Sequence, residues 1–292
     1  MSELAKRVAV ATVGIPVVLA LVRLGGWYLA IPLACLAAVG VHELFRFGGE
    51  AGLRPVALTG IAGAMAFVLL AAWRPTFASF APWALGVVAA LAALAILAAL
   101  FVQGPQGRPL ATASLALFGP VYVGLPLAVV PLLLALPEAR AWSTAEAEQW
   151  SGLAVIALPL AATWIGDASA YFAGSAWGRS RLAPAISPKK SWVGFWAELV
   201  GGAAAAALWL LVAGPWLPGL GMGAAAVILL GAVLGLAAVV GDLAESLFKR
   251  EAGVKDSGTV FPGHGGMLDR LDALLFTLPI AYLALALLGG RA

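Results

Sequence analysis

Apolar residues dominate the chain in nine blocks, and short polar segments separate these blocks. About 20 consecutive apolar residues form a helix long enough to cross the hydrocarbon core of a bilayer. The pattern therefore predicts an all-α, polytopic integral membrane protein with about nine transmembrane helices. The predicted spans are residues 8–22, 27–45, 56–73, 83–102, 112–136, 152–173, 193–213, 223–248 and 272–289.

Two of these spans have unusual features. Lys6 and Arg7 precede the first block as in a signal peptide, but no small-residue cleavage site follows, so we expect a retained helix. The fifth span contains Pro120, Pro126 and Pro131. Because proline lacks a backbone donor and clashes with the preceding turn, this span is predicted to be kinked or broken.

Composition supports the membrane prediction and narrows the chemistry. The chain is 63% hydrophobic and 11% charged, whereas soluble domains carry about 25% charged residues. A soluble globular protein is thereby excluded. The single cysteine, Cys35, allows no intrachain disulfide and no cysteine cluster for zinc. The two histidines, His42 and His264, lie in different segments, which disfavours a histidine-based metal site.

The distribution of positive charge predicts the orientation. With the N-terminus in the cytosol, most of the 17 Lys and Arg residues fall on the cytosolic side, as is typical of multi-pass proteins. We expect a protein of the cytoplasmic (inner) membrane whose active site faces the cytosol. Residues 1–150 would supply five N-terminal spans, and residues 151–292 a catalytic region with cytosolic loops at 174–192 and 249–271.

The end of the eighth predicted span carries an unusual polar face. Asp242, Glu245, Ser246 and Lys249 are spaced at i, i+3, i+4 and i+7, so they share one side of a helix. An ionisable residue in a span usually faces a bundle interior or an aqueous cavity. The alternative is a helix end that emerges into water, where polar residues are common.

The following loop combines glycines, cations and carboxylates. Glycines around His264 allow backbone N–H groups to converge on an anion, and the lysines and arginines suit phosphates. The aspartates suit Mg²⁺, which prefers carboxylate and phosphate oxygens. A basic loop that attracts anionic lipid heads would explain the cations but not the aspartates. The residues concerned are Lys249, Arg250, Lys255, Arg270, Gly263, Gly265, Gly266, Asp242, Asp256, Asp269 and Asp272.

A second candidate region surrounds the sixth predicted span. Trp164, Asp167 and Tyr171 lie at i, i+3 and i+7, and Asp167 sits in an apolar context. The segment Ser187-Pro-Lys189-Lys190-Ser-Trp192 follows. Its two lysines would suit a nucleotide triphosphate, and they would equally suit ordinary positive-inside anchoring.

The C-terminal signature resembles that of the phosphatidate cytidylyltransferases, also called CDP-diacylglycerol synthases. The segments 167–171 and 187–194 are also similar to segments of that family, although Ser175 and Val193 depart from its usual residues. The matching signature residues are Ser246, Lys249, Arg250, Lys255, Asp256, Gly258, Pro262, Gly263, His264, Gly265, Gly266, Asp269, Arg270 and Asp272.

The resemblance implies a homodimeric enzyme that joins CTP and phosphatidate with Mg²⁺, one or two cations per site, and binds no nucleic acid. It assigns the metal mainly to Asp242 and Asp269, with Ser246, Lys249 and His264 close by. We expect further metal contacts from Asp256 and Asp272, and catalytic charge from Lys249, Arg250, Lys255, His264 and Arg270. Expected substrate contacts are Asp167, Tyr171, Ser187, Lys189, Lys190, Ser246, Gly265 and Gly266.

Other functions remain open from the residues alone. A CTP-dependent lipid alcohol kinase would use similar groups but release CDP. An ion-coupled transporter could use Asp167 and Asp242 as a relay, since intramembrane carboxylates often serve such paths. The pattern of the CDP-alcohol phosphotransferases is missing from the sequence.

Overall fold

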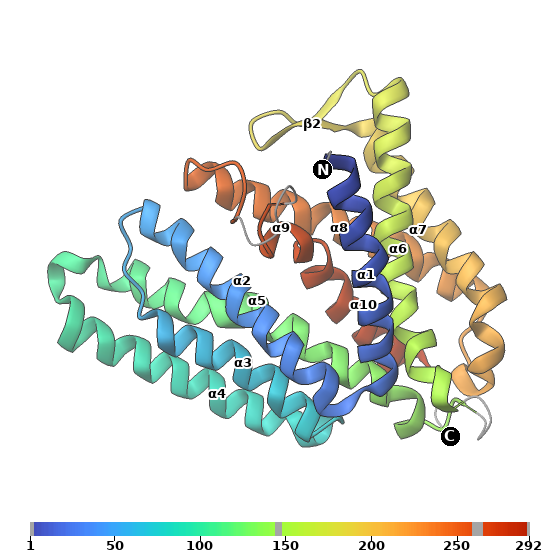
Figure 1. The fold of residues 1–292 in the computed structure, drawn as a ribbon, viewed down its shortest axis with the longest axis horizontal. Helices are drawn as coiled ribbons and strands as arrows, with labels where there is room; N and C mark the ends of the chain where they lie inside the picture. The colour runs from blue at the N-terminus through green and yellow to red at the C-terminus, as the bar shows by residue number, and fades with distance from the viewer. Residues whose placement is uncertain (1–2, 144–147, 259–264, 291–292) are drawn as a thin grey trace. The chain divides into compact units, whose positions relative to one another are not determined.

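The structure is a computed structural model that describes residues 3–143, 148–258 and 265–290 (Figure 1). Each predicted span coincides with a helix. The helices are α1 (Glu3–Leu24), α2 (Gly26–Glu50), α3 (Ala57–Trp73), α4 (Phe77–Ala98), α5 (Pro109–Ala139), α6 (Glu148–Trp177), α7 (Trp192–Val212), α8 (Ala224–Glu251), α9 (Leu268–Leu271) and α10 (Leu274–Leu288).

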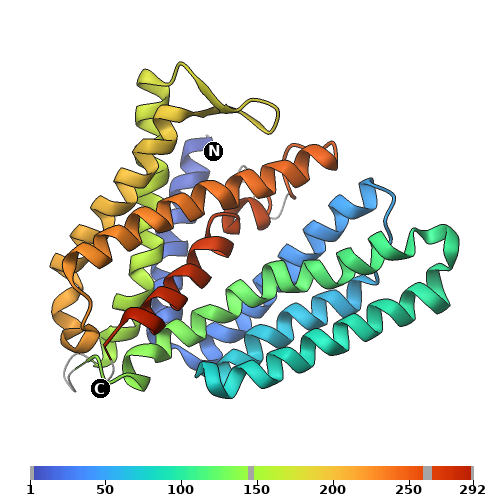
Figure 2. The ribbon, with the colours of Figure 1, turned by 180° about the vertical axis from the view of Figure 1, so that it is seen from behind.

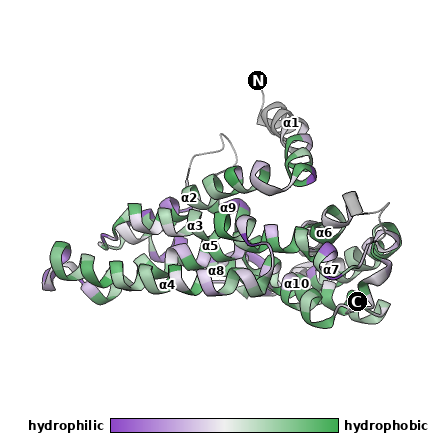
Figure 3. Cartoon of the chain, turned by 90° about the horizontal axis from the view of Figure 1, so that it is seen from below, coloured by the Kyte–Doolittle hydropathy of each residue, from purple (hydrophilic) through white to green (hydrophobic). Residues whose placement is uncertain are grey.

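Seven helical segments among the described residues are long and apolar enough to cross a membrane. Helix α3 is apolar but shorter, at 17 residues. Apolar residues cover most of the helix surfaces, as the green colour of α4 shows in Figure 3. The multi-pass prediction is therefore confirmed, while the count of nine spans and the orientation stay predictions.

The chain divides into two compact units, each built from segments distant in sequence. Unit 1 comprises residues 1–132 and 248–270, and unit 2 comprises residues 133–247 and 271–292. Helices α5 and α8 contribute to both units. The predicted functional division at residue 150 stays a prediction, since compactness does not test which region carries a reaction.

Unit 1 contains a layer in which α2, α3 and α4 lie side by side (Figures 1 and 2). Small residues let these helices approach closely, as is usual in membranes. Phe45 of α2 fits against Gly60 of α3 and Gly119 of α5, where an added Cβ would clash with its ring. Glu43, two positions before Phe45, points to a different side of α2 and is also buried, so α2 is packed on both sides.

Unit 2 is built around α6, α7 and α8. The backbones of α7 and α8 nearly touch, because an added Cβ at Gly202 would meet the carbonyl of Gly231, and one at Gly231 would meet that of Gly202. A third glycine, Gly235, lies against the carbonyl of Glu198 in the same way. Close helix approach therefore places the polar residues of α7 beside those of α8.

Two features differ from the sequence-based expectations. Helix α5 runs without a break through Pro120, Pro126 and Pro131, so the predicted break is absent, while the kink stays a prediction. Neighbouring helices in a membrane protein can satisfy the backbone groups that the prolines leave free. The predicted loop 174–192 is partly regular: α6 continues to Trp177, and an antiparallel hairpin of β1 (Arg181–Ala183) and β2 (Ser187–Ser191) follows. The all-α prediction therefore needs this one small correction.

The contact between α7 and α8 generates a stability prediction. Gly231→Leu should reduce the free energy of unfolding by about 2 kcal/mol or more, because overpacking must push the two backbones apart. Thermal unfolding in detergent measures the effect. The matched control is Gly86→Leu in α4, where an added Cβ meets nothing within 4 Å. Equal stability of the two variants would contradict the close-packing argument.

Candidate active site

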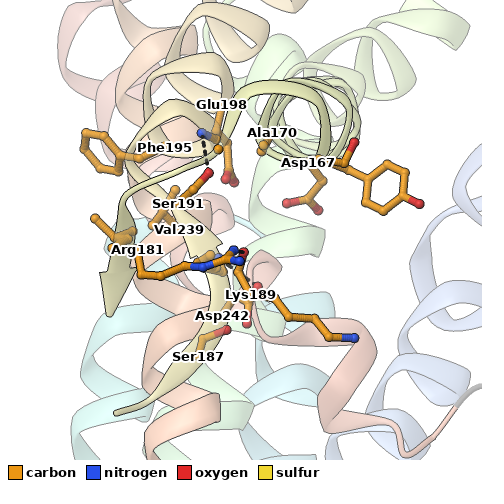
Figure 4. A pocket seen from close by; sticks show the side chains of 17 residues that line it. Asp167, Ala170, Arg181, Ser187, Lys189, Ser191, Phe195, Glu198, Val239 and Asp242 are labelled. Carbon is orange, nitrogen blue, oxygen red and sulfur yellow. Dashed lines mark hydrogen bonds and ion pairs between the residues drawn. The ribbon is translucent and has the colours of Figure 1, made fainter. Parts of the chain in front are cut away.

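Unit 2 contains a polar cavity of about 510 Å³, lined in part by the hairpin (Figure 4). Helices α6, α7 and α8 supply carboxylates, and the hairpin supplies cations. We call it the hairpin cavity. Its charged and hydroxyl-bearing lining residues are Asp167, Tyr171, Ser175, Arg181, Ser187, Lys189, Lys190, Ser191, Glu198 and Asp242.

Asp242 has a defined partner on each carboxylate oxygen. Lys190 Nζ lies 2.8 Å from Oδ2, and the hydroxyl of Ser246, one turn along α8, donates to Oδ1 at 3.2 Å. The structure thus brings together three residues that the sequence placed in two separate motifs. An anionic phosphate could compete for Lys190, because a lysine carries a mobile point charge.

The hairpin is anchored to the start of α7. The Ser191 hydroxyl accepts a hydrogen bond from the N–H of Gly194 at 3.1 Å and so caps the helix. Gly178 lies so near that an added Cβ would clash with Ser191 Oγ. Arg181 donates to the carbonyl of Lys189 at 3.1 Å across the hairpin. Ser187, Lys189 and Lys190 are therefore held at the cavity wall.

Glu198 is a cavity residue that the sequence analysis missed. Its side chain is 3% exposed, and Oε1 has no hydrogen-bond partner within the described part of the chain. Figure 4 shows the carboxyl groups of Asp167 and Glu198 pointing toward one another, and the two interact. The signal was available, because Glu198 is an ionisable residue inside an apolar span, like Asp167.

A second polar cluster lies in unit 1, around Asp269 at the start of α9. Lys249 Nζ lies 2.6 Å from Oδ1. Oδ2 accepts hydrogen bonds from the backbone N–H groups of Ser257 at 2.9 Å and Gly266 at 2.8 Å, and lies 3.0 Å from the Ser257 hydroxyl. Asp269 is therefore fixed by partners on both oxygens, as suits a residue that orients a charged ligand.

Glu43 of α2 is the second residue that the sequence analysis missed. Its side chain is 2% exposed and accepts hydrogen bonds from Ser257, Met267 and Leu268. The sequence placed it in a predicted span, but no nearby motif drew attention to it. Its contacts join α2 to the residues on either side of segment 258–266, which we call the signature loop.

The remaining predicted residues are dispersed. Arg250, Lys255, Asp256 and Arg270 are exposed, and Asp272 accepts a hydrogen bond from the next backbone N–H at 2.7 Å. His264 lies outside the described residues, with Pro262 and Gly263.

The predicted metal ligands do not form a ready-made site in the part of the chain that the structure describes. No three His, Cys, Asp or Glu side chains gather there in an arrangement that would hold a metal ion. Asp242 belongs to unit 2 and Asp269 to unit 1, so their joint role stays a prediction.

Comparison with known proteins decides the family. The model of the "Cytidylyltransferase family" matches residues 5–288, which is nearly the whole chain. The chain belongs to the cytidylyltransferase family. The resemblance inferred from the C-terminal signature is thereby confirmed.

Similar proteins of this family come from several bacteria. A phosphatidate cytidylyltransferase of Synechocystis sp. is 36% identical over 299 residues, which cover 97% of this chain and 97% of that protein. One from Thermotoga maritima is 40% identical over 139 residues, covering 48% of this chain and 52% of the relative. One from Brucella abortus is 45% identical over 133 residues, covering 45% and 47%. The match to the first relative spans both units of this cytidylyltransferase.

The carboxyl pair in the hairpin cavity predicts a gain of stability on substitution. Glu198→Gln should raise the thermal midpoint by about 2–4 °C, because it replaces a buried ionisable carboxyl beside Asp167 with a neutral amide that can donate a hydrogen bond to Asp167. The control is Glu138→Gln, at an exposed position of α5. A lowered midpoint for Glu198→Gln alone would show that the carboxylate itself stabilises the fold.

Proposed function

We propose that this chain is a phosphatidate cytidylyltransferase, which transfers CMP from CTP to phosphatidate and yields CDP-diacylglycerol and pyrophosphate. The observation that carries the proposal is the match to the Synechocystis sp. relative along 97% of both chains. The hairpin cavity supports it with chemistry, because a membrane protein that is 11% charged gathers cations and carboxylates there.

The reaction itself is a displacement at phosphorus. A phosphate oxygen of phosphatidate attacks the α-phosphorus of CTP, and the bond to the bridging oxygen of the β-phosphate breaks. Pyrophosphate leaves with that oxygen. The nucleophile is already anionic near neutral pH, so catalysis requires alignment and charge neutralisation more than a strong base.

The hairpin cavity suits the triphosphate of CTP. Its volume lies in the range of about 300–1,000 Å³ that small-molecule sites usually have. Arg181, Lys189 and Lys190 offer donors for phosphate oxygens. Lys190 would turn from Asp242 to a phosphate, which would leave a carboxylate oxygen of Asp242 without its cation.

The donors in this cavity also fit Mg²⁺. The buried Oε1 of Glu198 lacks a hydrogen-bond partner among the described residues, and Asp167 and Asp242 line the same cavity. Mg²⁺ usually binds one or two carboxylates and keeps waters and substrate phosphates as its other ligands. When bound, one or two such ions would neutralise the phosphates. Asp242 and Asp269 are the proposed main ligands, and Asp256 and Asp272 further ones.

Residues of unit 1 would supply the remaining charge. Lys249 holds Asp269 in place, and Arg250, Lys255 and Arg270 would attract the anionic substrates and the leaving pyrophosphate. The roles of Gly265 and Gly266 would be to present backbone N–H groups, and Gly266 already donates one to Asp269. We assign His264 a secondary role, because the nucleophile needs no strong base.

The membrane setting follows from the lipid substrate. The acyl chains of phosphatidate must stay in the bilayer while its head reaches CTP, which is cytosolic. We therefore propose nine spans, a cytosolic N-terminus and an active site that faces the cytosol in the inner membrane. The proposed assembly is a homodimer, as in the family it resembles.

The decisive experiment is a product assay with the purified protein in detergent. With phosphatidate, Mg²⁺ and CTP labelled at the α-phosphate, label should enter the lipid fraction, and a chelator should abolish the transfer. Label that remains in water as CDP while a lipid alcohol gains phosphate would indicate a kinase. Ion flux in proteoliposomes without CTP turnover would indicate a transporter.

The proposed electrostatic mechanism ranks two side chains. Asp269→Asn should lower kcat about 10³-fold, because it removes a charge that both orients Lys249 and would bind metal. His264→Ala should lower kcat by less than about tenfold, below the roughly 10²–10⁴-fold that general acid–base catalysis usually contributes. The labelled-CTP assay measures both variants. Comparable losses would contradict the ranking and give His264 a primary role.

A further inference from the structure

Glu43 binds both ends of the signature loop in unit 1. Its Oε2 accepts hydrogen bonds from the Ser257 hydroxyl at 2.8 Å and the Leu268 N–H at 2.8 Å, and Oε1 accepts one from the Met267 N–H at 3.0 Å. These partners lie more than 200 positions away along the chain. The Glu43 side chain therefore joins Ser257, before the loop, to Met267 and Leu268, after it.

The backbone on both sides of the loop is shaped to admit this carboxylate. An added Cβ at Gly258 would clash with Glu43 Oε1, and one at Gly266 would lie 2.6 Å from the same oxygen. Glycine is therefore required at both positions for the chain to approach so closely. Two signature glycines thus have a physical reason that involves a residue outside the signature.

The hydrogen bonds require a carboxylate in particular. Three donors converge on the two oxygens of Glu43, and a carboxylate is the only common side chain of this shape that accepts at both ends. Glutamine would turn an N–H₂ group toward at least one donor. A buried charge is costly, so stability alone would favour an apolar residue here.

Ser257 connects Glu43 to Asp269. Its hydroxyl lies 2.8 Å from Glu43 Oε2 and 3.0 Å from Asp269 Oδ2, but it has one proton. When the proton points to Glu43, Asp269 keeps the two backbone donors on Oδ2 and Lys249 on Oδ1 but loses the hydroxyl donor. Glu43 therefore influences how Asp269 presents its charge.

We propose that Glu43 is a positioning residue for the cytidylyl transfer: it fixes both ends of the signature loop and, through Ser257, the carboxylate of Asp269. Glu43 itself is buried and touches no substrate. The inference rests on the proposed role of Asp269, and it adds a residue from the N-terminal helices to a site otherwise drawn from the C-terminal half.

The test compares Glu43→Gln with Glu50→Gln, which alters an exposed glutamate on the same helix. Glu43→Gln should lower kcat by about 10–100-fold, the usual effect of removing a group that orients a ligand-binding residue. The KM values for CTP and phosphatidate should change by less than about threefold, and Glu50→Gln should match the unmodified protein. Full activity of a folded Glu43→Gln protein would overturn the inference.

A double-mutant cycle separates positioning from general loss of structure. Ser257→Ala removes the link while leaving the packing nearly intact, so it should also lower kcat, and adding Glu43→Gln should cost little more. Losses that multiply would show that Glu43 acts independently of Ser257 and would overturn the inference. The Ser257→Ala result alone keeps the proposal testable if Glu43→Gln does not fold.

The variant Asp269→Asn distinguishes a failure of the positioning role of Glu43 from a failure of the proposed role of Asp269. If it abolishes transfer while Glu43→Gln has no effect, the inference fails and the proposed role of Asp269 stands. If Asp269→Asn retains activity, the proposed role of Asp269 fails, and so does the positioning that depends on it.

Discussion

The cost of a carboxylate in a membrane helix is the constraint on which the polar parts of this structure depend. A charge removed from water must find partners or a counter-ion. Glu43 has three hydrogen-bond donors, and Asp269 has a lysine and backbone N–H groups. Glu198 differs, because one buried oxygen lacks a partner among the described residues. Glu43 and Asp269 are therefore carboxylates that fix the backbone around them, whereas Glu198 is suited to binding a ligand.

Small residues make these arrangements possible. Gly202, Gly231 and Gly235 bring α7 against α8, and these two helices supply Glu198 and Asp242 to the hairpin cavity. In unit 1, Gly258 and Gly266 let the chain approach Glu43. Side-chain packing drives helix association in a bilayer, where lipid tails are as apolar as leucine. Each cluster therefore depends on glycines whose lack of a side chain allows the close approach.

The sequence predicted the helices well, because a run of apolar residues has few structural outcomes in a bilayer. The C-terminal signature indicated the polar site less directly, and so did the prediction that cations surround Asp242. The hairpin at 181–191 was missed, since Ser, Pro and Lys do not alternate in hydropathy. Glu198 was missed because it stands alone in an apolar span, and Glu43 because it has only His42 beside it. Only tertiary contacts show which partners each glutamate has.

The hairpin also restricts where the length of the chain can vary. Ser191 ends β2 and caps α7, so the strand and the helix are joined without a spacer. A residue inserted between Lys190 and Ser191 would turn each lysine to the other face of the strand relative to α7, because side chains alternate along a strand. An insertion in the turn at 184–186 would leave both lysines in register. Insertions and deletions would therefore be tolerated at that turn and excluded from the five residues that follow.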